Sequence, residues 1–299
     1  MYSYCAYGLG IHSVLPLPEL ISPLGRVEPE VIVQTGTVEE AKGMPDDCIE
    51  WGWATPDDIY LYWRDVCALR VTGGKTLIVH ALPGSQDAQI RFLILNRGLP
   101  AILHQKGFLV LHGSVVAINQ KAVVFLGESQ QGKSTLAAFL HQRGHWLMAD
   151  DLAAMRTELA PPLVYPGFPE MRLWPDTLKS LGEMPEEWAS VPHRLDKRTR
   201  TLSTGFSTSI LPLQKIFVLA EGQAPQISVL SPREAFLSLM QHSVAAGLLG
   251  PSNTSATHLH QCANLIRNVP ICRFERPRSL EALPDFARLV ELDLAGVSR

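Results

Sequence analysis

The chain has 299 residues, of which 18% are charged and 46% hydrophobic, and its formal net charge is -3. Because domains commonly contain about 100–200 residues, a chain of this length is expected to form one large domain or two modest ones. The ordinary hydrophobic content excludes disorder as the main state, and the charge near zero argues against a nucleic-acid-binding protein held by bulk electrostatics.

The sequence also argues against a membrane or secreted protein. No run of about 18 hydrophobic residues is free of charges and turn formers, so no membrane span is predicted. The N-terminus lacks the basic segment of a signal peptide. The five cysteines are odd in number, widely spaced and form no Cys-x-x-Cys pair, which fits free thiols better than disulfides or a zinc site. We therefore expect a cytoplasmic protein.

Residues 1–88 are predicted to form a small, mostly β domain. The segment is rich in proline, glycine and acidic residues and contains no catalytic constellation, so substrate recognition is left open as its role. A hairpin turn is predicted at Gly73-Gly74, and Gly8-Leu9-Gly10 is interpreted as a turn. The expected strands are Val31–Gln34, Ile59–Trp63, Ala68–Val71 and Thr76–Val79.

Residues 89–299 are predicted to form a second domain of the α/β class. Hydrophobic residues recur at helical spacing in some segments and form short uninterrupted runs, typical of strands, in others. The expected helices are Ile90–Lys106, Ser134–Arg143, Ser231 to about Ala246, Thr254–Arg267 and Leu280–Leu292. The expected strands are Phe108–Val110, Ser114–Ile118, Ala122–Leu126, His145–Ala149, Lys215–Leu219 and Gln226–Val229, with His112-Gly113 interrupting the first two.

Residues 127–134, here called the glycine loop, carry the strongest functional signal. Their sequence Gly-Glu-Ser-Gln-Gln-Gly-Lys-Ser satisfies the pattern GxxxxGK(S/T), with a buried strand before it and a helix after it. Backbone N–H groups of such a loop, together with the helix N-terminus, attract phosphate. Lys133 is expected to reach the β- and γ-phosphates and the Ser134 hydroxyl to bind Mg²⁺. A chance match in an ordinary turn is expected in roughly one such chain in a hundred.

The predicted nucleotide-binding residues are Gly127, Glu128, Ser129, Gln130, Gln131, Gly132, Lys133, Ser134 and Thr135.

Asp150 and Asp151 follow the next hydrophobic strand, seventeen residues after Lys133. An acidic residue at the end of a strand beside a phosphate loop is placed to serve Mg²⁺ or to act as a base. Because neighbouring side chains diverge, the pair can divide these roles. The alternative is a solvated turn, since Asp is common after strands.

Three further groups have ordinary explanations when taken alone. His112 fits a histidine of the core or of a turn, and Glu170 and Arg172 fit a surface loop. The basic run Lys197, Arg198 and Arg200 fits a solvated face. A phosphoryl-transfer site nevertheless needs such cations to neutralise the γ-phosphate oxygens.

Leu111-His112-Gly113-Ser114, the glycine loop and Ala149-Asp150-Asp151, at these spacings, resemble the HPr kinase/phosphorylase family. The segments Ser13–Leu20, Pro166–Pro175 and Asp196–Arg198 resemble in particular HPr-kinase-related proteins found beside peptide-modification genes, including lasso-peptide kinases. The resemblance implies a P-loop HPr-kinase-like domain, with a central sheet flanked by helices, preceded by the small mostly-β domain.

The resemblance also implies residue roles. Asp150 is then the base that accepts the seryl proton, His112 holds or tunes it, and Asp151 serves the metal with Ser134. Ser129 lines the phosphate loop. Glu170 is a further metal-side or acceptor-side acid. Arg198 neutralises charge, with Lys197 and Arg200 as alternates.

The sequence departs from the family in two places. Gln130 stands where the family has glycine, and the segment that HPr kinases use to dock HPr has no match. HPr itself, and the reverse phosphorylase activity, are therefore not expected.

The function that we predict is transfer of the γ-phosphate of ATP, with Mg²⁺, to a Ser hydroxyl of a peptide or protein. The resemblance suggests a ribosomal precursor peptide of the lasso type as the acceptor. A small-molecule P-loop kinase and a non-enzymatic NTP-gated regulatory module remain alternatives. We expect neither nucleic acid nor membrane as a partner, and homo-oligomerisation, like ATP against GTP, is left open.

Overall fold

The computed structural model describes the chain except residues 40–42, 46, 192–193, 245–255 and 297–299. The described chain divides into two compact units. The first comprises Met1–Val110 and Val244–His258, and the second comprises Leu111–Ser243 and Leu259–Arg299. Among the described residues, no helix is long and hydrophobic enough to cross a membrane.

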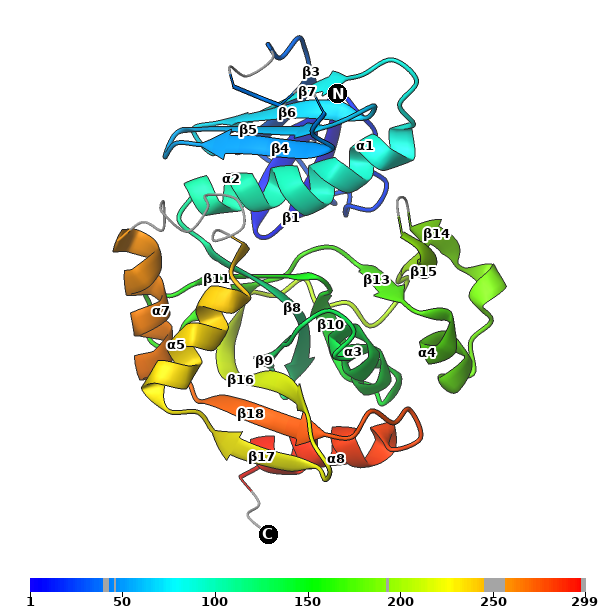
Figure 1. Cartoon of the computed structure of the whole chain (residues 1–299), viewed down its shortest axis with the longest axis vertical. Helices are drawn as coiled ribbons and strands as arrows, with labels where there is room; N and C mark the ends of the chain where they lie inside the picture. Colours follow the sequence, from blue (N-terminus) through cyan, green and yellow to red (C-terminus); the bar gives the residue numbers. More distant parts are fainter. Residues whose placement is uncertain (40–42, 46, 192–193, 245–255, 297–299) are drawn as a thin grey trace. The chain divides into compact units, whose positions relative to one another are not determined.

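The first unit contains a seven-stranded sheet in the order β1-β2-β3-β7-β6-β5-β4 (Figure 1). The four strands predicted for this region are confirmed, and Gly73-Gly74 forms the hairpin turn between β6 and β7, with φ angles of 58° and 62°. Three strands, β1, β2 and β4, were not predicted. The strands are β1 (Tyr2–Ala6), β2 (Leu9–Ser13), β3 (Val31–Thr35), β4 (Glu50–Ala54), β5 (Asp58–Trp63), β6 (Cys67–Thr72) and β7 (Thr76–Ala81).

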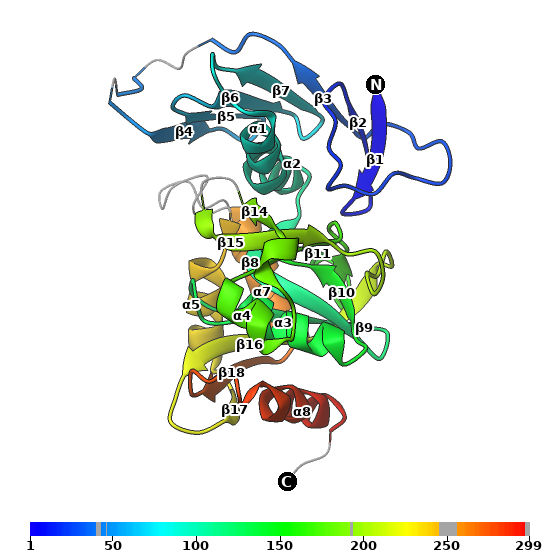
Figure 2. The same cartoon turned by 90° about the vertical axis from the view of Figure 1, so that its right-hand side faces the viewer.

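A helical segment covers one face of this sheet (Figures 1 and 2). It consists of α1 (Asp87–Leu93), the π-helical turn η1 (Ile94–Gly98) and α2 (Leu99–Gln105), where a single helix was predicted. Gly98 permits close packing, since a Cβ there would lie 2.8 Å from Leu77 Cδ2. This packing groups the segment with the first sheet, so the division between the units does not coincide with the predicted boundary at residues 88 and 89.

The second unit is built on an eight-stranded sheet in the order β10-β8-β11-β12-β16-β18-β17, with β9 paired to β16 and β8. The mixed α/β class that we predicted is confirmed. Strands β9, β16 and β18 run parallel, so their carboxyl ends lie at one edge. The strands are β8 (Leu109–Ile118), β9 (Lys121–Leu126), β10 (Trp146–Ala149), β11 (Leu152–Arg156), β12 (Leu163–Tyr165), β16 (Leu211–Glu221), β17 (Gln226–Val229) and β18 (Ile271–Arg276).

The predicted interruption of β8 at His112-Gly113 is wrong, because the strand is continuous. Gly113 pairs with Leu126 of β9, and a Cβ on Gly113 would lie 2.7 Å from the Phe125 carbonyl oxygen. The glycine therefore permits a close approach of two strands and does not break one.

Helices cover both faces of this sheet (Figures 1 and 2). On one face, α3 (Lys133–Gln142) and α8 (Leu283–Leu294) pack over the rings of Phe125, Phe217 and Phe274, which stack or meet edge to face. Phe286 of α8 meets the Phe274 ring edge to face. On the other face lie α5 (Pro232–Gln241) and α7 (Ala256–Asn268). The C-terminal end of α3 is tied to α8, because Arg143 donates two hydrogen bonds of 2.8 Å to Glu291, whose carboxylate also contacts His145.

Helix α5 begins with the predicted N-cap. The Ser231 hydroxyl accepts a hydrogen bond from the Glu234 backbone, and the Glu234 carboxylate accepts one from the Ser231 backbone. The helix ends at Gln241, before the predicted end near Ala246, and residues 245–255, with the predicted start at Thr254, lie outside the described residues.

A separate three-stranded sheet has the order β13-β15-β14, with α4 (Pro175–Ser180) and the short helix η2 (Pro185–Glu187) beside it. Its strands are β13 (Glu170–Leu173), β14 (Ala189–Val191) and β15 (Arg194–Thr201). The surface-loop explanation of Glu170 and Arg172 is wrong, since both lie in β13 with exposed fractions of 8% and 7%. The strand itself contains no proline: Pro166 and Pro169 precede it, Pro175 follows it, and its four residues pair with β15.

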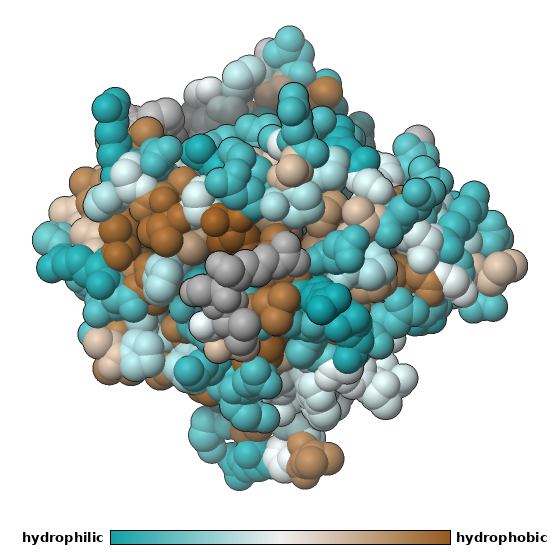
Figure 3. All heavy atoms as spheres, turned by 90° about the horizontal axis from the view of Figure 1, so that it is seen from below, coloured by the Kyte–Doolittle hydropathy of each residue, from teal (hydrophilic) through white to brown (hydrophobic). Residues whose placement is uncertain are grey.

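Figure 3 shows one face of the molecule, on which hydrophobic side chains lie among a larger number of hydrophilic ones. In the second unit, the exposed large hydrophobic residues include Trp146, Val229 and Leu237, which belong to three different elements. Hydrophobic residues that are exposed singly are ordinary on protein surfaces.

Candidate functional site

The glycine loop connects the end of β9 to the start of α3. Gly132 is the N-cap of α3 and has a φ of 76°, a left-handed conformation that favours glycine. Lys133 is only 6% exposed, and its Nζ donates hydrogen bonds to the carbonyls of Gly127 (2.8 Å) and Glu128 (3.0 Å). Burial lowers the pKa of Lys133, while the charges of Asp151 and Asp150 oppose this shift.

Two side chains at the rim of the loop are held by neighbouring helices. The Glu128 carboxylate accepts a hydrogen bond of 2.9 Å from Gln241 at the end of α5. The Thr135 hydroxyl lies 3.2 Å from the Thr177 hydroxyl of α4. Ser129 and Gln130 are exposed at the tip of the loop.

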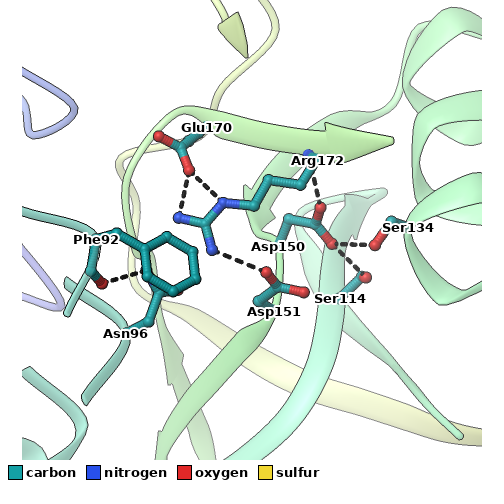
Figure 4. A network of polar contacts seen from close by, with 8 residues as sticks. All are labelled: Phe92, Asn96, Ser114, Ser134, Asp150, Asp151, Glu170 and Arg172. Carbon is teal, nitrogen blue, oxygen red and sulfur yellow. Dashed lines mark hydrogen bonds and ion pairs between the residues drawn. The ribbon is translucent and has the colours of Figure 1, made fainter. Parts of the chain in front are cut away.

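Asp150, between β10 and β11, is the meeting point of the site (Figure 4). Its Oδ1 accepts hydrogen bonds from the hydroxyls of Ser114 (2.7 Å) and Ser134 (2.8 Å), and its Oδ2 accepts one of 3.1 Å from the Arg172 backbone N–H. One carboxylate therefore joins β8, the first turn of α3 and β13.

Asp151 takes a different partner. Its Oδ2 accepts a hydrogen bond of 3.0 Å from Arg172 Nη1, and its own φ is 70°. The same guanidinium contacts the Glu170 carboxylate through Nε and Nη2 (Figure 4). Arg172 thus lies between two carboxylates, which together compensate its buried charge.

The surroundings move the pKa values of the two aspartates apart. Removal from water, together with the charge of Asp151, raises the pKa of Asp150. Burial also acts to raise the pKa of Asp151, but the charges of Arg172 and Lys197 outweigh it and hold that pKa below its ordinary value. Asp150 is consequently the member of the pair that takes a proton more readily, and Asp151 the member that stays ionised.

Two histidines lie next to the lysine of the loop. The His112 backbone N–H donates a hydrogen bond of 2.7 Å to the His242 carbonyl, and protonated His112 would lower the pKa of Asp151. His242 is 7% exposed, and burial, with the nearby charge of Lys133, lowers its pKa to about 4. The His242 imidazole is therefore neutral at physiological pH. Sequence analysis did not identify His242, since nothing in its local pattern marks it.

The basic run on β15 is divided between the two faces of its sheet. Arg172 is opposite Thr199 and Leu173 is opposite Arg198 in the antiparallel register. Because side chains alternate along a strand, Lys197 shares the face of Arg172, whereas Arg198 and Arg200 lie on the other face. Arg198 donates to the Ser190 hydroxyl, and Arg200 pairs with Glu183.

Lys197 was the alternative to Arg198 for neutralising charge. The structure brings Lys197 toward the site, since its charge acts on both aspartates and on Lys133. Arg198, the residue first chosen for charge neutralisation, is not brought there.

The predicted metal ligands do not form one cluster. Ser134 donates to Asp150, while Asp151 and Glu170 pair with Arg172. No group of three or more His, Cys, Asp or Glu side chains is placed to hold a metal ion in the described part of the chain. A Mg²⁺ ion commonly takes only one or two carboxylates and completes its shell with substrate phosphates and water. The Ser134 hydroxyl, beside Asp150, provides one oxygen for such a shell.

Comparison with known proteins does not assign the chain to a family. No protein-family model matches the chain, and no characterised protein matches its sequence. Among solved structures, a similar one is the Hpr(Ser) kinase/phosphatase from Coxiella burnetii. The sequence identity is 11%, the TM-score is 0.31, and the match covers 62% of this chain and 93% of that one. At this TM-score the likeness carries no argument about the family or function of the chain.

The backbone of the loop generates a first prediction. Gln130 has a φ of 67°, in the left-handed region where a side chain costs about 1–2 kcal/mol, whereas Gln131 is not among the residues with positive φ. Gln130→Gly should therefore raise the free energy of unfolding by about 0.5–1 kcal/mol, after the flexibility that glycine adds to the unfolded chain is subtracted. Gln131→Gly, the matched control, should lower it. Urea unfolding checks both variants, and equal effects would contradict the strain at Gln130.

Proposed function

We propose that the chain is a Mg²⁺- and ATP-dependent phosphotransferase that transfers the γ-phosphoryl group to a Ser hydroxyl of a peptide or protein. The observation that carries the proposal is the bond from Ser134, the last residue of the glycine loop, to Asp150. This contact joins a phosphate-loop sequence to a carboxylate with a raised pKa. Phosphoryl transfer needs mainly positioning and charge neutralisation, with one group to accept the hydroxyl proton.

In this proposal Asp150 accepts the proton of the attacking hydroxyl. Its Oδ1 already accepts hydrogen bonds from two hydroxyls, those of Ser114 and Ser134. The Arg172 backbone N–H fixes its other oxygen. Burial keeps the pKa of Asp150 raised, and the negative charge of Asp151, which stays ionised beside Arg172, adds to this effect. Burial lowers the pKa of His112, against the opposing charges of Asp151 and Asp150, so the protonated form, which would lower the pKa of Asp151, is disfavoured.

Cations on two sides would neutralise the transferred group. Lys133, in the glycine loop, would bind the β- and γ-phosphates, and Lys197 of β15 would face the equatorial oxygens from the acceptor side. Mg²⁺, when bound with the nucleotide, supplies further charge neutralisation. The Ser134 hydroxyl would hold it, because that hydroxyl donates its hydrogen to Asp150 and keeps its lone pairs for a cation. Asp151 and Glu170 would take part only after release from Arg172.

The acceptor is proposed on two grounds. The sequence resemblance to HPr-kinase-related proteins of peptide-modification clusters favours a peptide Ser, with a lasso-type precursor as the first to try. In the first unit, the edge strand β4 carries Trp51 and Trp53, which pack against the Tyr60 ring. Unpaired backbone groups at a sheet edge, with aromatic side chains beside them, suit an extended peptide. We therefore include peptide recognition by this unit in the proposal.

The direct test is a transfer assay with γ-labelled ATP and three acceptor conditions, namely a Ser-containing peptide, free serine and no acceptor. The proposal expects label on the peptide only. Label on free serine but not on the peptide would favour a small-molecule kinase. Nucleotide binding without transfer to either would favour a regulatory module that nucleotide binding controls. Both of these results would overturn the proposal.

Replacement of the loop lysine tests nucleotide binding. Lys133→Ala removes the cation nearest the β- and γ-phosphates and should weaken binding of a non-hydrolysable ATP analogue by roughly tenfold or more, since charge-assisted hydrogen bonds contribute about 1.5–3 kcal/mol. Transfer should fall below detection. Titration calorimetry measures the affinity, with Lys121→Ala, on the exposed start of β9, as the control. Unchanged affinity in Lys133→Ala would exclude a phosphate role for the loop.

Replacement of each aspartate by asparagine tests the division of roles. Asp150→Asn keeps the shape but removes the base, so single-turnover transfer should fall about 10²–10⁴-fold while nucleotide affinity survives. Asp151→Asn removes the negative charge that raises the pKa of Asp150. The pKa of Asp150 should fall, and the acidic limb of the kcat profile should move to lower pH. Wild-type transfer rates in Asp150→Asn would exclude it as the base.

A matched pair on β15 tests the acceptor-side cation. Lys197 lies on the face of Arg172 and Arg198 lies on the other face. Lys197→Met should lower kcat by roughly 10-fold or more, as expected when one charged hydrogen bond to the transition state is lost. Arg198→Met should leave kcat within about twofold, in line with an exposed surface contact. The reverse order of effects would restore Arg198 as the neutralising residue.

A further inference from the structure

Arg276, the last residue of β18, reaches the edge of the sheet where the glycine loop begins. In the parallel register, Arg273 of β18 is opposite Val218 of β16, and Val218 is opposite Leu126, the last residue of β9. Strand β18 continues for three more residues to Arg276. Its end therefore extends past the point at which β9 gives way to the loop.

The guanidinium of Arg276 lies against the loop itself. Its Nη2 donates a hydrogen bond of 2.5 Å to the Gln131 carbonyl. A Cβ built on Gly132 would lie 2.8 Å from the same Nη2 and 3.8 Å from the Thr135 Cβ. The Phe286 ring supports the group from below, with its centroid 5.3 Å from Cζ. The position is thus at the N-terminus of α3, on the Thr135 side.

Among the described residues, the charge of Arg276 has no anionic partner. The residue is 8% exposed, its Nε makes no hydrogen bond, and none of its described neighbours forms an ion pair with it. Burial and the neighbouring charge of Arg278 lower its pKa. The other two buried cations of the site are compensated, since Lys133 has Asp150 and Asp151 nearby and Arg172 pairs with Glu170 and Asp151.

Two physical costs act on Arg276 at once. An uncompensated charge away from water is unfavourable. In addition, the N-terminus of a helix carries a partial positive charge, so it repels a cation and attracts an anion. An anion bound beside the guanidinium would remove both costs. A helix N-terminus preceded by a glycine loop is a site that binds phosphate, which is such an anion.

We propose that Arg276 is a nucleotide-binding residue, and that its guanidinium pairs with the α- and β-phosphates of the nucleotide bound at the glycine loop. The proposal rests on the proposed function only in requiring that the loop binds a nucleotide. Arg276 then contacts the polyphosphate from the Thr135 side, while Lys133 contacts the β- and γ-phosphates. Its contribution is accordingly shared by ADP and ATP, whereas a group that contacts the γ-phosphate alone would affect ATP only.

The experiment measures the affinities for ADP and for a non-hydrolysable ATP analogue by titration calorimetry with three variants. Arg276→Gln keeps a donor for the Gln131 carbonyl but removes the charge, and it should lose roughly 10- to 100-fold in affinity for both nucleotides. Arg276→Lys keeps the charge and should recover part of this loss. Arg278→Met is the matched control, because Arg278 is exposed and pairs with Glu221, and its affinities should be unchanged.

The outcomes separate this inference from the proposed function. If Arg276→Gln binds both nucleotides like the wild type, or if Arg276→Lys is no better than Arg276→Gln, Arg276 only clamps the loop through Gln131 and the inference is wrong. If the wild type itself binds neither nucleotide, the nucleotide site and the proposed function fail together. If the variants behave as expected but no acceptor is phosphorylated, Arg276 is a nucleotide-binding residue and the proposed phosphotransferase function is wrong. Circular dichroism of each variant verifies that it is folded.

Discussion

The Asp150 carboxylate is the contact on which the rest of the site depends. It accepts hydrogen bonds from Ser114 in β8, from Ser134 in the first turn of α3 and from the backbone of β13. These three elements belong to different parts of the second unit, two to the central sheet and its helix and one to the separate small sheet. Loss of the carboxylate would leave two hydroxyls and a backbone N–H without this acceptor, so the geometry of the site and its chemistry depend on the same atoms.

Charge balance is the second constraint. Asp151 and Glu170 compensate Arg172, and the same two aspartates act on Lys133. Ionisation of one aspartate disfavours ionisation of the other, because two negative charges in a half-buried position repel each other. The state of the pair with one proton is therefore favoured over the state with two negative charges. Lys197, Lys133 and Arg172 limit this repulsion, so the state of the aspartates depends on cations contributed by β15, α3 and β13.

The sequence predicted the local elements well and the long-range contacts less well. The strand before the glycine loop, the helix after it and the aspartates after the next strand follow from hydrophobic runs and spacing, which are local. The position of Gly113 was misinterpreted, because its role comes from the approach of β9 and not from its neighbours in the chain. The choice between Lys197 and Arg198 depends on the register of β15 with β13, which composition does not specify. Arg276 is remote in sequence and joins the loop only because β16 and β18 are parallel.

Arg143, at the far end of α3, is held to α8 by a bidentate pair with Glu291, which His145 also contacts. This anchor fixes the helix at the end that faces away from the glycine loop. Together with the burial of Leu136, Ala137 and Leu140 in the core, this contact opposes sliding of the helix along its axis when a ligand contacts its first turn. The adjustment must come from the loop residues themselves, among which Gly127 and Gly132 provide the torsional freedom. The orientation of the helix, and with it the direction of its dipole, is set before a ligand arrives, so little reorganisation energy is spent on binding.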